Sequence, residues 1–294
     1  HGTNRRQRQM CIRDRSNRLY DRFRARIMFP IRDSRGRCIA FGGRSLDPTA
    51  RAKYLNSPET PLFDKGSNLY NLVSARSAVG RGEPLIVTEG YMDVIALDSG
   101  NFNGAIAPLG TAITEKQLQL MWRISPEPII ALDGDKAGLR AAYRLIDLSL
   151  PLLRTGKALR FSIMPEGKDP DDLIRNEGAS VFKNLIDEAV PMVDLIWRRE
   201  TEGKSFDSPE RRAGLDKSLS DVIALIKEKN LKNHYRDALF QARRQFFGIQ
   251  NTGKTEFKSN SRLMPQSNTK SSFLVAADEK TVSAQIREST IIAV

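Results

Sequence analysis

The sequence contains few residues that bind zinc or form disulfides. Among its 294 residues are two cysteines, Cys11 and Cys38, and two histidines, His1 and His234. A tetrahedral zinc site would need all four of these scattered residues around one ion, and a disulfide framework needs several cysteine pairs. We therefore expect neither in this chain. The low cysteine content also favours a reducing, cytoplasmic setting.

Long apolar runs are absent as well. No segment approaches the roughly 20 consecutive apolar residues that span a bilayer, and no apolar core of a signal peptide is recognisable. The sequence therefore predicts no membrane span and no membrane partner. Hydrophobic residues still make up 40% of the chain, which is enough to build a core, and the length allows more than one domain.

Negative charge is scarce relative to positive charge. The chain has 47 lysines and arginines against 35 aspartates and glutamates, and its formal net charge is +12. Residues 1–37 alone contain twelve arginines and three aspartates. Any single arginine is by default a solvated surface charge. The excess over the whole chain favours a nucleic-acid partner, with an anionic membrane surface as the second choice.

The residue pattern divides the chain into five segments. Residues 1–15 lack helical or strand periodicity and are expected to be a non-native or disordered leader. Residues 16–80 have short apolar runs broken by Gly, Pro and Asn, which predict a mixed α+β subdomain of basic character. Residues 81–178 alternate between strand and helix patterns, and residues 179–249 show apolar stripes with helical period. Residues 250–294 are polar and predict a linker or disordered tail.

The segment 81–178 contains four strand–helix units in succession. The expected strands are residues 85–88, 104–110, 129–133 and 158–164. Such an order predicts an α/β fold in which a parallel sheet is flanked by helices on both faces. In sheets of this kind, chemistry collects at the carboxyl ends of the strands.

Acidic residues follow three of these strands and would meet at one edge of the sheet. They are Glu89 and Asp93 after the first strand, Asp133 and Asp135 after the third, and Asp169 and Asp171 after the fourth. Oxygen ligands without cysteine or histidine suit Mg²⁺ or Mn²⁺. Alternatively, these aspartates cap helices and form turns, a role that we assign to Asp98 and Asp172.

A metal-binding edge in a basic chain favours phosphate chemistry on nucleic acid, because divalent ions stabilise displacement at phosphorus. Lys136 and Lys168 adjoin the acidic residues. They would either hold a phosphate or balance the negative charge, and the sequence favours neither role.

The motifs VTEGYMD, ALDGDKAG and GKDPDDLI, each after a predicted strand, resemble those of the Toprim fold, the topoisomerase–primase module. The segments RIMFPIRDSRGRCIAFGGRSL and AKYLNSPETPLFDKGSNLYNL resemble the catalytic core of bacterial replicative primases of the DnaG type. This resemblance extends from about residue 18 to residue 178 and, more weakly, to residue 248. A topoisomerase would need a tyrosine nucleophile on a separate domain, which is not recognisable here.

The resemblance implies a nucleotidyltransferase that makes short RNA primers on single-stranded DNA from ribonucleoside triphosphates. It implies that Glu89 is the general acid/base, that Asp133 and Asp135 are also catalytic, and that all six acidic residues named above serve the divalent ions. It further implies contacts to the nucleotide or the template from Arg44, Lys53, Asn56 and Lys65.

Members of this family usually carry an N-terminal zinc-binding module and a C-terminal module that docks on the replicative helicase. Neither is recognisable here, so the sequence is interpreted as a fragment, and the helicase is expected as a partner of the full-length protein. A Toprim-type nuclease, another metal-dependent DNA phosphodiester enzyme and a non-catalytic single-stranded-DNA-binding fragment remain alternatives.

Overall fold

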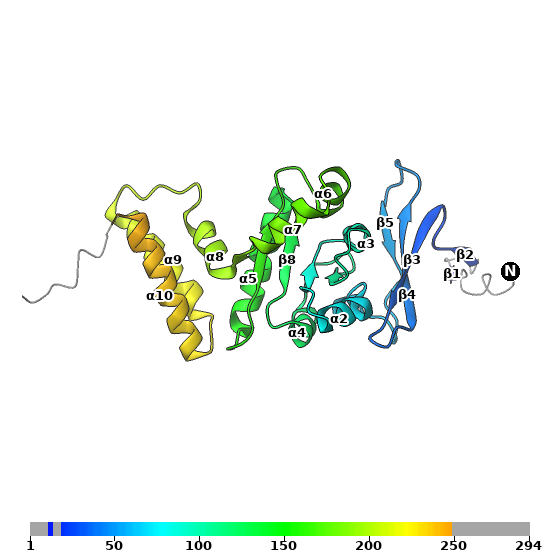
Figure 1. Ribbon diagram of the computed structural model, residues 1–294, viewed down its shortest axis with the longest axis horizontal. Coiled ribbons are helices and arrows are strands. Elements are labelled where there is room, and N and C mark those ends of the chain that lie inside the picture. The colour runs from blue at the N-terminus through cyan, green and yellow to red at the C-terminus, as the bar shows by residue number, and fades with distance from the viewer. Residues whose placement is uncertain (1–10, 14–18, 249–294) are drawn as a thin grey trace, which may run out of the picture. The chain divides into compact units, whose positions relative to one another are not determined.

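The computed structural model describes residues 11–13 and 19–248 (Figure 1). The predicted tail, residues 250–294, and most of the predicted leader lie outside the described residues. Within the leader, however, β1 (Cys11–Arg13) pairs antiparallel with β2 (Leu19–Asp21). The three residues of β1 are too few to show a period, and the interpretation of residues 1–15 as a non-native or disordered leader stays a prediction.

A three-stranded antiparallel sheet follows, in the order β3-β4-β5. Its strands are β3 (Arg26–Arg32), β4 (Cys38–Ser45) and β5 (Tyr54–Asn56). A tight turn joins β3 and β4, in which Gly36 adopts a left-handed φ of 82° that glycine accepts without strain. Ile31 and Ala40 are buried in a small core with Phe63 and Leu109.

The second sheet has the order β10-β9-β8-β6-β7. Its strands are β6 (Ile86–Val87), β7 (Ala105–Ile106), β8 (Ile129–Leu132), β9 (Arg160–Ile163) and β10 (Val190–Pro191). The four predicted strands pair in parallel, as expected. The fifth strand, β10, pairs antiparallel with β9 at the edge and was not predicted.

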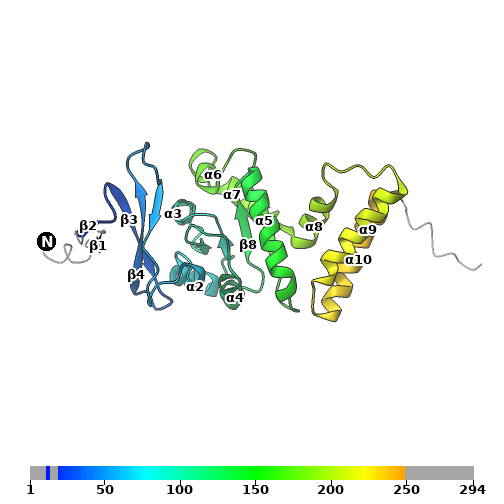
Figure 2. The same ribbon diagram turned by 180° about the vertical axis from the view of Figure 1, so that it is seen from behind.

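Helices cover both faces of this parallel sheet. Those within the predicted strand–helix region are α3 (Tyr91–Ser99), α4 (Glu115–Ile124), α5 (Lys136–Ser149) and α6 (Pro170–Asn176), with the 3₁₀ turn η2 (Leu150–Leu152). Helix α2 (Leu72–Gly80) and the 3₁₀ turn η1 (Lys65–Ser67) precede that region. Figures 1 and 2 show α3 and α5 on opposite sides of β8.

Successive side chains along each strand point to opposite faces of the sheet, and both faces are covered. Ile86 and Ala131 point into a core that includes Leu97 of α3, whereas their neighbours Val87 and Ile130 point to the opposite face. There they line a cavity of about 340 Å³ together with side chains of α5. Because both faces are covered, β6, β7 and β8 are apolar throughout, as is typical of parallel sheets.

Four more helices complete the described chain: α7 (Ala179–Asp187), α8 (Met192–Thr201), α9 (Pro209–Ala224) and α10 (Lys229–Phe246). Pro191 separates α7 from α8, and the Ser208 side chain caps α9 by accepting the N–H of Arg211. Phe182 and Ile186 of α7 pack into the sheet core, so α7 and β10 belong to the sheet layer rather than to the helical subdomain. Among the described residues, no helix is long and apolar enough to cross a membrane.

Candidate functional site

The acidic residues predicted from the sequence lie at the carboxyl ends of β6, β8 and β9. Glu89 comes two residues after β6, Asp133 directly after β8, and Asp169 in the connection from β9 to α6. The three strands run parallel, and β8 pairs with both β6 and β9. All three acidic residues therefore lie at the same edge, which we call the acidic edge.

Asp133 occupies the centre of the acidic edge. Its backbone N–H donates to Oε1 of Glu89 at 3.4 Å. Burial, followed by the negative charges of Glu89 and Asp169, raises the pKa of Asp133 to about 7. Its Oδ1 is buried and accepts no hydrogen bond from the described chain. Such a carboxylate is poorly stabilised without a cation.

Asp93 and Glu89 both interact electrostatically with Asp133. Asp93 is only 8% exposed, and its Oδ2 accepts the N–H of Gly90 at 3.0 Å. Burial first, and then the charge of Asp133, raises the pKa of Asp93 to about 7. Burial and the charge of Asp135 likewise raise the pKa of Glu89. Asp133 is thus close enough to both Asp93 and Glu89 for their charges to interact with its own.

Asp135 and Asp169 also cap helices. Oδ1 of Asp135 accepts the N–H groups of Ala137 and Gly138, both at 2.7 Å, and begins α5. Oδ1 of Asp169 accepts the N–H of Asp172 at 2.7 Å and begins α6. One oxygen of each of these two carboxylates therefore caps a helix, as the alternative prediction had it. These hydrogen bonds also fix the two side chains at the acidic edge.

Asp171 is balanced by two cations. Its Oδ1 lies 2.6 Å from Nε of Arg175, one turn further along α6. Burial raises the pKa of Asp171 most strongly, while the charges of Arg175 and Arg44 act in the opposite direction. Arg44 belongs to β4, so the antiparallel sheet brings positive charge to the acidic edge.

A close backbone contact joins the loops after β8 and β9. The N–H of Gly134 donates to the carbonyl of Lys168 at 3.0 Å, and the N–H of Gly167 donates to the carbonyl of Gly134 at 3.2 Å. A Cβ at position 134 would lie 1.9 Å from the carbonyl oxygen of Pro165. Glycine therefore lets the two acidic loops meet, which the sequence alone did not reveal.

Two of the predicted nucleotide-binding cations lie over one aromatic ring. The Arg44 guanidinium is 6.0 Å, and the Lys53 ammonium 5.8 Å, from the ring centroid of Tyr54. Burial raises the pKa of Tyr54; the charge of Arg44 lowers it, and the charge of Asp93 raises it. Arg44 and Lys53 thus lie beside the acidic edge, where a phosphate would meet them.

Asn56 connects the two sheets. Its Nδ2 donates to the carbonyl of Leu109 at 2.8 Å, and its own carbonyl accepts Nε of Arg22 at 3.1 Å. Its Oδ1 is buried and accepts no hydrogen bond from the described residues. The structure therefore gives Asn56 a clear role in joining the sheets, and sequence reasoning missed its partner Arg22.

Tyr91 is a further residue whose position the sequence did not indicate. Its ring, on the first turn of α3, lies 4.8 Å from Phe29, 5.5 Å from Tyr54 and 5.6 Å from Tyr70. Three of these rings come from the predicted N-terminal subdomain. The cluster packs that subdomain against the helix that carries Asp93.

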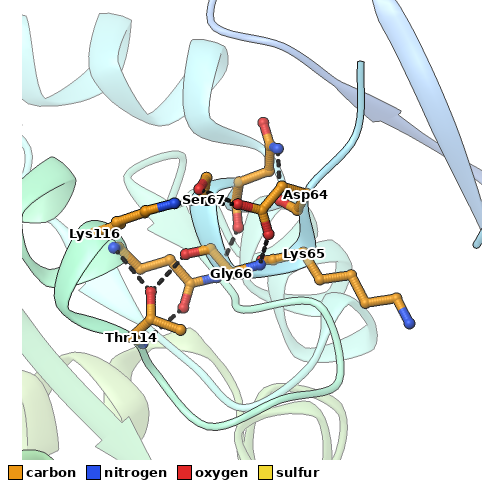
Figure 3. A network of polar contacts seen from close by, with 8 residues as sticks. Asp64, Lys65, Gly66, Ser67, Thr114 and Lys116 are labelled. Atoms are coloured by element: carbon orange, nitrogen blue, oxygen red, sulfur yellow. Dashed lines mark hydrogen bonds and ion pairs between the residues drawn. The ribbon is translucent and has the colours of Figure 1, made fainter. Parts of the chain in front are cut away.

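The backbone of Lys65, rather than its side chain, takes part in a network of hydrogen bonds (Figure 3). Its carbonyl accepts Nε2 of Gln117 at 2.9 Å, and Asp64 caps η1 by accepting the N–H of Gly66 at 2.9 Å. Figure 3 shows the Lys65 side chain pointing away from this network. Within residues 19–248, its ammonium forms no ion pair. The structure thus does not bring Lys65 together with the acidic residues.

The acidic edge fits a divalent cation by its chemistry. Among the described residues, no three acidic side chains are close enough to hold one ion as they stand. The donors are nevertheless all carboxylates, burial and then their mutual repulsion raise the pKa of Asp93 and Asp133, and Asp133 has a buried oxygen without a partner among the described residues. A hard divalent ion satisfies each of these features.

Comparisons with known proteins agree with this geometry. Residues 3–76 match the N-terminal domain of the DNA primase catalytic core, and residues 83–161 match the Toprim domain. A DNA primase domain from Pseudomonas aeruginosa is 40% identical, with a TM-score of 0.74 and coverage of 82% of this chain and 74% of that one. A structure described as the DnaG primase catalytic domain bound to ssDNA is 39% identical, with a TM-score of 0.73 over 82% of this chain and 79% of that one. This chain belongs to the DnaG-type DNA primase family.

The primase relatives are longer than this chain. The DNA primase of Rickettsia felis is 43% identical over 74% of this chain but 36% of its own length, and that of Escherichia coli K12 is 40% identical over 78% and 39%. The chain therefore spans less than half of these primases. The first family match starts at residue 3 and includes most of the predicted leader, whose boundary stays a prediction.

Proposed function

We propose that this chain is the RNA-polymerising core of a bacterial replicative primase, which makes short RNA primers on single-stranded DNA. The observation that carries the proposal is the position of Asp133. It interacts electrostatically with Glu89, Asp93 and Asp169, while Arg44 acts on the neighbouring Asp171 and shares the ring of Tyr54 with Lys53. Carboxylates that can hold a divalent ion beside cations that can hold phosphates form a suitable site for nucleotidyl transfer.

The proposed ligands of the ions, Mg²⁺ or Mn²⁺, are Glu89, Asp93, Asp133, Asp135, Asp169 and Asp171. When bound, such an ion polarises a phosphoryl oxygen and favours ionisation of the attacking hydroxyl. Arg44 and Lys53 orient the phosphates of the nucleotide or the template. Asn56 positions the strand that directly follows Lys53, because it ties β5 to the loop after β7.

In the proposed reaction, the primer 3′-oxygen forms a bond to the α-phosphorus of a ribonucleoside triphosphate. The bond from that phosphorus to the bridging oxygen breaks, and pyrophosphate leaves. Glu89 accepts the proton of the 3′-hydroxyl. Its raised pKa suits this role, because a base is most effective when its pKa approaches the working pH.

The proposed partners are single-stranded DNA, ribonucleoside triphosphates and the growing RNA primer. The similar structure described as bound to ssDNA supports the first of these. The replicative helicase is proposed as a partner of the full-length protein only. This activity would place the protein in the cytoplasm, at the replication fork.

The product formed on a single-stranded template tests the proposal. Incubation with labelled ribonucleotides and Mg²⁺ should yield short RNA, whereas a Toprim-type nuclease would cleave the DNA and a binding fragment would leave it unchanged. Asp133→Asn should lower the rate at least about 100-fold. Asp98→Asn, a matched change at an exposed position on α3, should leave it unchanged. Cleaved DNA without RNA, or full activity in Asp133→Asn, would overturn the proposal.

A further inference from the structure

A second charged cavity lies at the sheet edge opposite the acidic edge. Its volume is about 820 Å³. Its walls come from the end of α4, from η2 with the loop that leads into β9, and from the connection between α9 and α10. Helix α5 begins at Asp135 on the acidic edge and ends next to η2, and its 14 residues span about 21 Å at ~1.5 Å per residue. The cavity is therefore separate from the proposed catalytic site.

Four cations line this cavity: Arg123, Arg154, Lys157 and Lys227. None of them forms an ion pair with the described part of the chain. The single carboxylate in the lining is Glu228, so the formal charge of the lining is 4 − 1 = +3. Converging cations of this kind repel one another unless an anion lies between them.

Glu228 is already engaged by a neighbour. Its Oε2 accepts the N–H of Thr155 at 2.7 Å, and its Oε1 accepts the Thr155 hydroxyl. These bonds tie the connection between α9 and α10 to the loop after η2. The carboxylate thus shapes the cavity, and none of the four cations forms an ion pair with it or with another described residue.

The floor of the cavity is rigid and partly apolar. Trp122 is 5% exposed, and its Nε1 donates to the carbonyl of Ala158 at 2.9 Å. Lys157 donates to the carbonyl of Trp122, which directs its ammonium along the cavity wall. Pro151 and Leu152 complete an apolar floor. Ligand sites commonly combine such a floor with a few convergent polar groups.

We propose that this cavity binds a compact polyphosphate, carried either by a nucleoside or by inorganic polyphosphate. The four cations come from three separate segments and converge on one cavity rather than follow a groove. This arrangement suits several negative charges on adjacent phosphates better than the spaced charges of an extended acidic peptide. The apolar floor offers a surface for a nucleobase.

Titration calorimetry tests the proposal in EDTA and without template, so that the result does not depend on primer synthesis. ATP should bind the wild-type protein, and adenosine should bind at least about tenfold more weakly. Tighter binding of ATP than of tripolyphosphate identifies a nucleoside polyphosphate as the ligand, whereas equal affinity identifies inorganic polyphosphate. If adenosine binds as well as ATP, or an Asp/Glu-rich peptide binds more tightly, the proposal is wrong.

Paired variants assign the binding to this cavity. Arg123→Gln combined with Lys227→Gln should weaken ATP binding at least about tenfold, because two exposed cations that contact phosphate are lost. Arg76→Gln with Lys217→Gln removes the same charge from exposed helical positions elsewhere and should change nothing. Arg44→Gln with Lys53→Gln should also retain binding. Loss of binding in this last variant, or retention in the first, would contradict the proposal.

Discussion

At the residue scale, the acidic edge is a set of carboxylates held close to one another against their mutual repulsion. The sequence predicted all six of them from their places after strands, because position in a parallel sheet follows from the alternation of elements. The sequence did not predict which of these carboxylates have a raised pKa. That depends on burial and on the charges around Asp133, which come from three separate loops.

The raised pKa values predict how stability depends on pH in the metal-free protein. Asp93 and Asp133 titrate near pH 7 when folded, against an ordinary value of 3.8. Between about pH 4 and pH 7 the folded protein binds more protons than the unfolded chain, so its stability falls as the pH rises through this window. Urea unfolding in EDTA should show lower stability at pH 8 than at pH 5.5.

Two comparisons test the origin of this pH dependence. Asp93→Asn should reduce it, and saturating Mg²⁺ should raise stability more at pH 8 than at pH 5.5. Acids such as Asp33 and Asp64, whose pKa values are lowered, change protonation below this window. A metal-free wild-type protein that is equally stable at both pH values would contradict the assignment.

At the element scale, a helix or strand could be predicted from its own residues where it has a cap residue or a regular apolar pattern. Thr114 and Ser208, both common cap residues, cap α4 and α9, and the four parallel strands were predicted from their apolar runs. Strand β10 was missed because its two residues show no period. The position of β10 depends on the adjacent strand β9, whose Arg160 guanidinium donates to the carbonyl of Ala189.

The contact between the two acidic loops gives a prediction at this scale. Gly134→Ala should lower the free energy of unfolding by at least about 2 kcal/mol, because the new Cβ would meet the backbone carbonyls of Met164 and Pro165. Urea unfolding measures this loss. Gly214→Ala, inside α9 with open space around it, should instead raise stability by up to about 1 kcal/mol. Equal effects of the two changes would show that the loops are not in contact.

At the scale of the whole molecule, the site depends on contacts between regions that are distant in the sequence. The aromatic cluster around Tyr91 and the bond from Asn56 to Leu109 join the antiparallel sheet to the parallel sheet. Neither follows from local patterns, because the partners are separated by tens of residues. The resemblance to primases indicated that these segments act together, and the structure gives the contacts.

Substitutions of Tyr91 test this junction. Tyr91→Ala should lower the free energy of unfolding by about 3–5 kcal/mol, as expected for a buried aromatic ring. Tyr91→Phe should be neutral or stabilising, since the buried hydroxyl has no hydrogen-bond partner among the described residues. Chemical denaturation measures both. A large loss in Tyr91→Phe would show that the hydroxyl is bonded after all.

Binding of Mn²⁺, followed by calorimetry or electron paramagnetic resonance without nucleotide, tests most directly whether the acidic edge is a metal site. The wild-type protein should bind the ion, and Asp133→Asn should bind it at least about tenfold more weakly because the central carboxylate is lost. Asp98→Asn should bind it as the wild-type protein does. Unchanged affinity in Asp133→Asn would contradict the account.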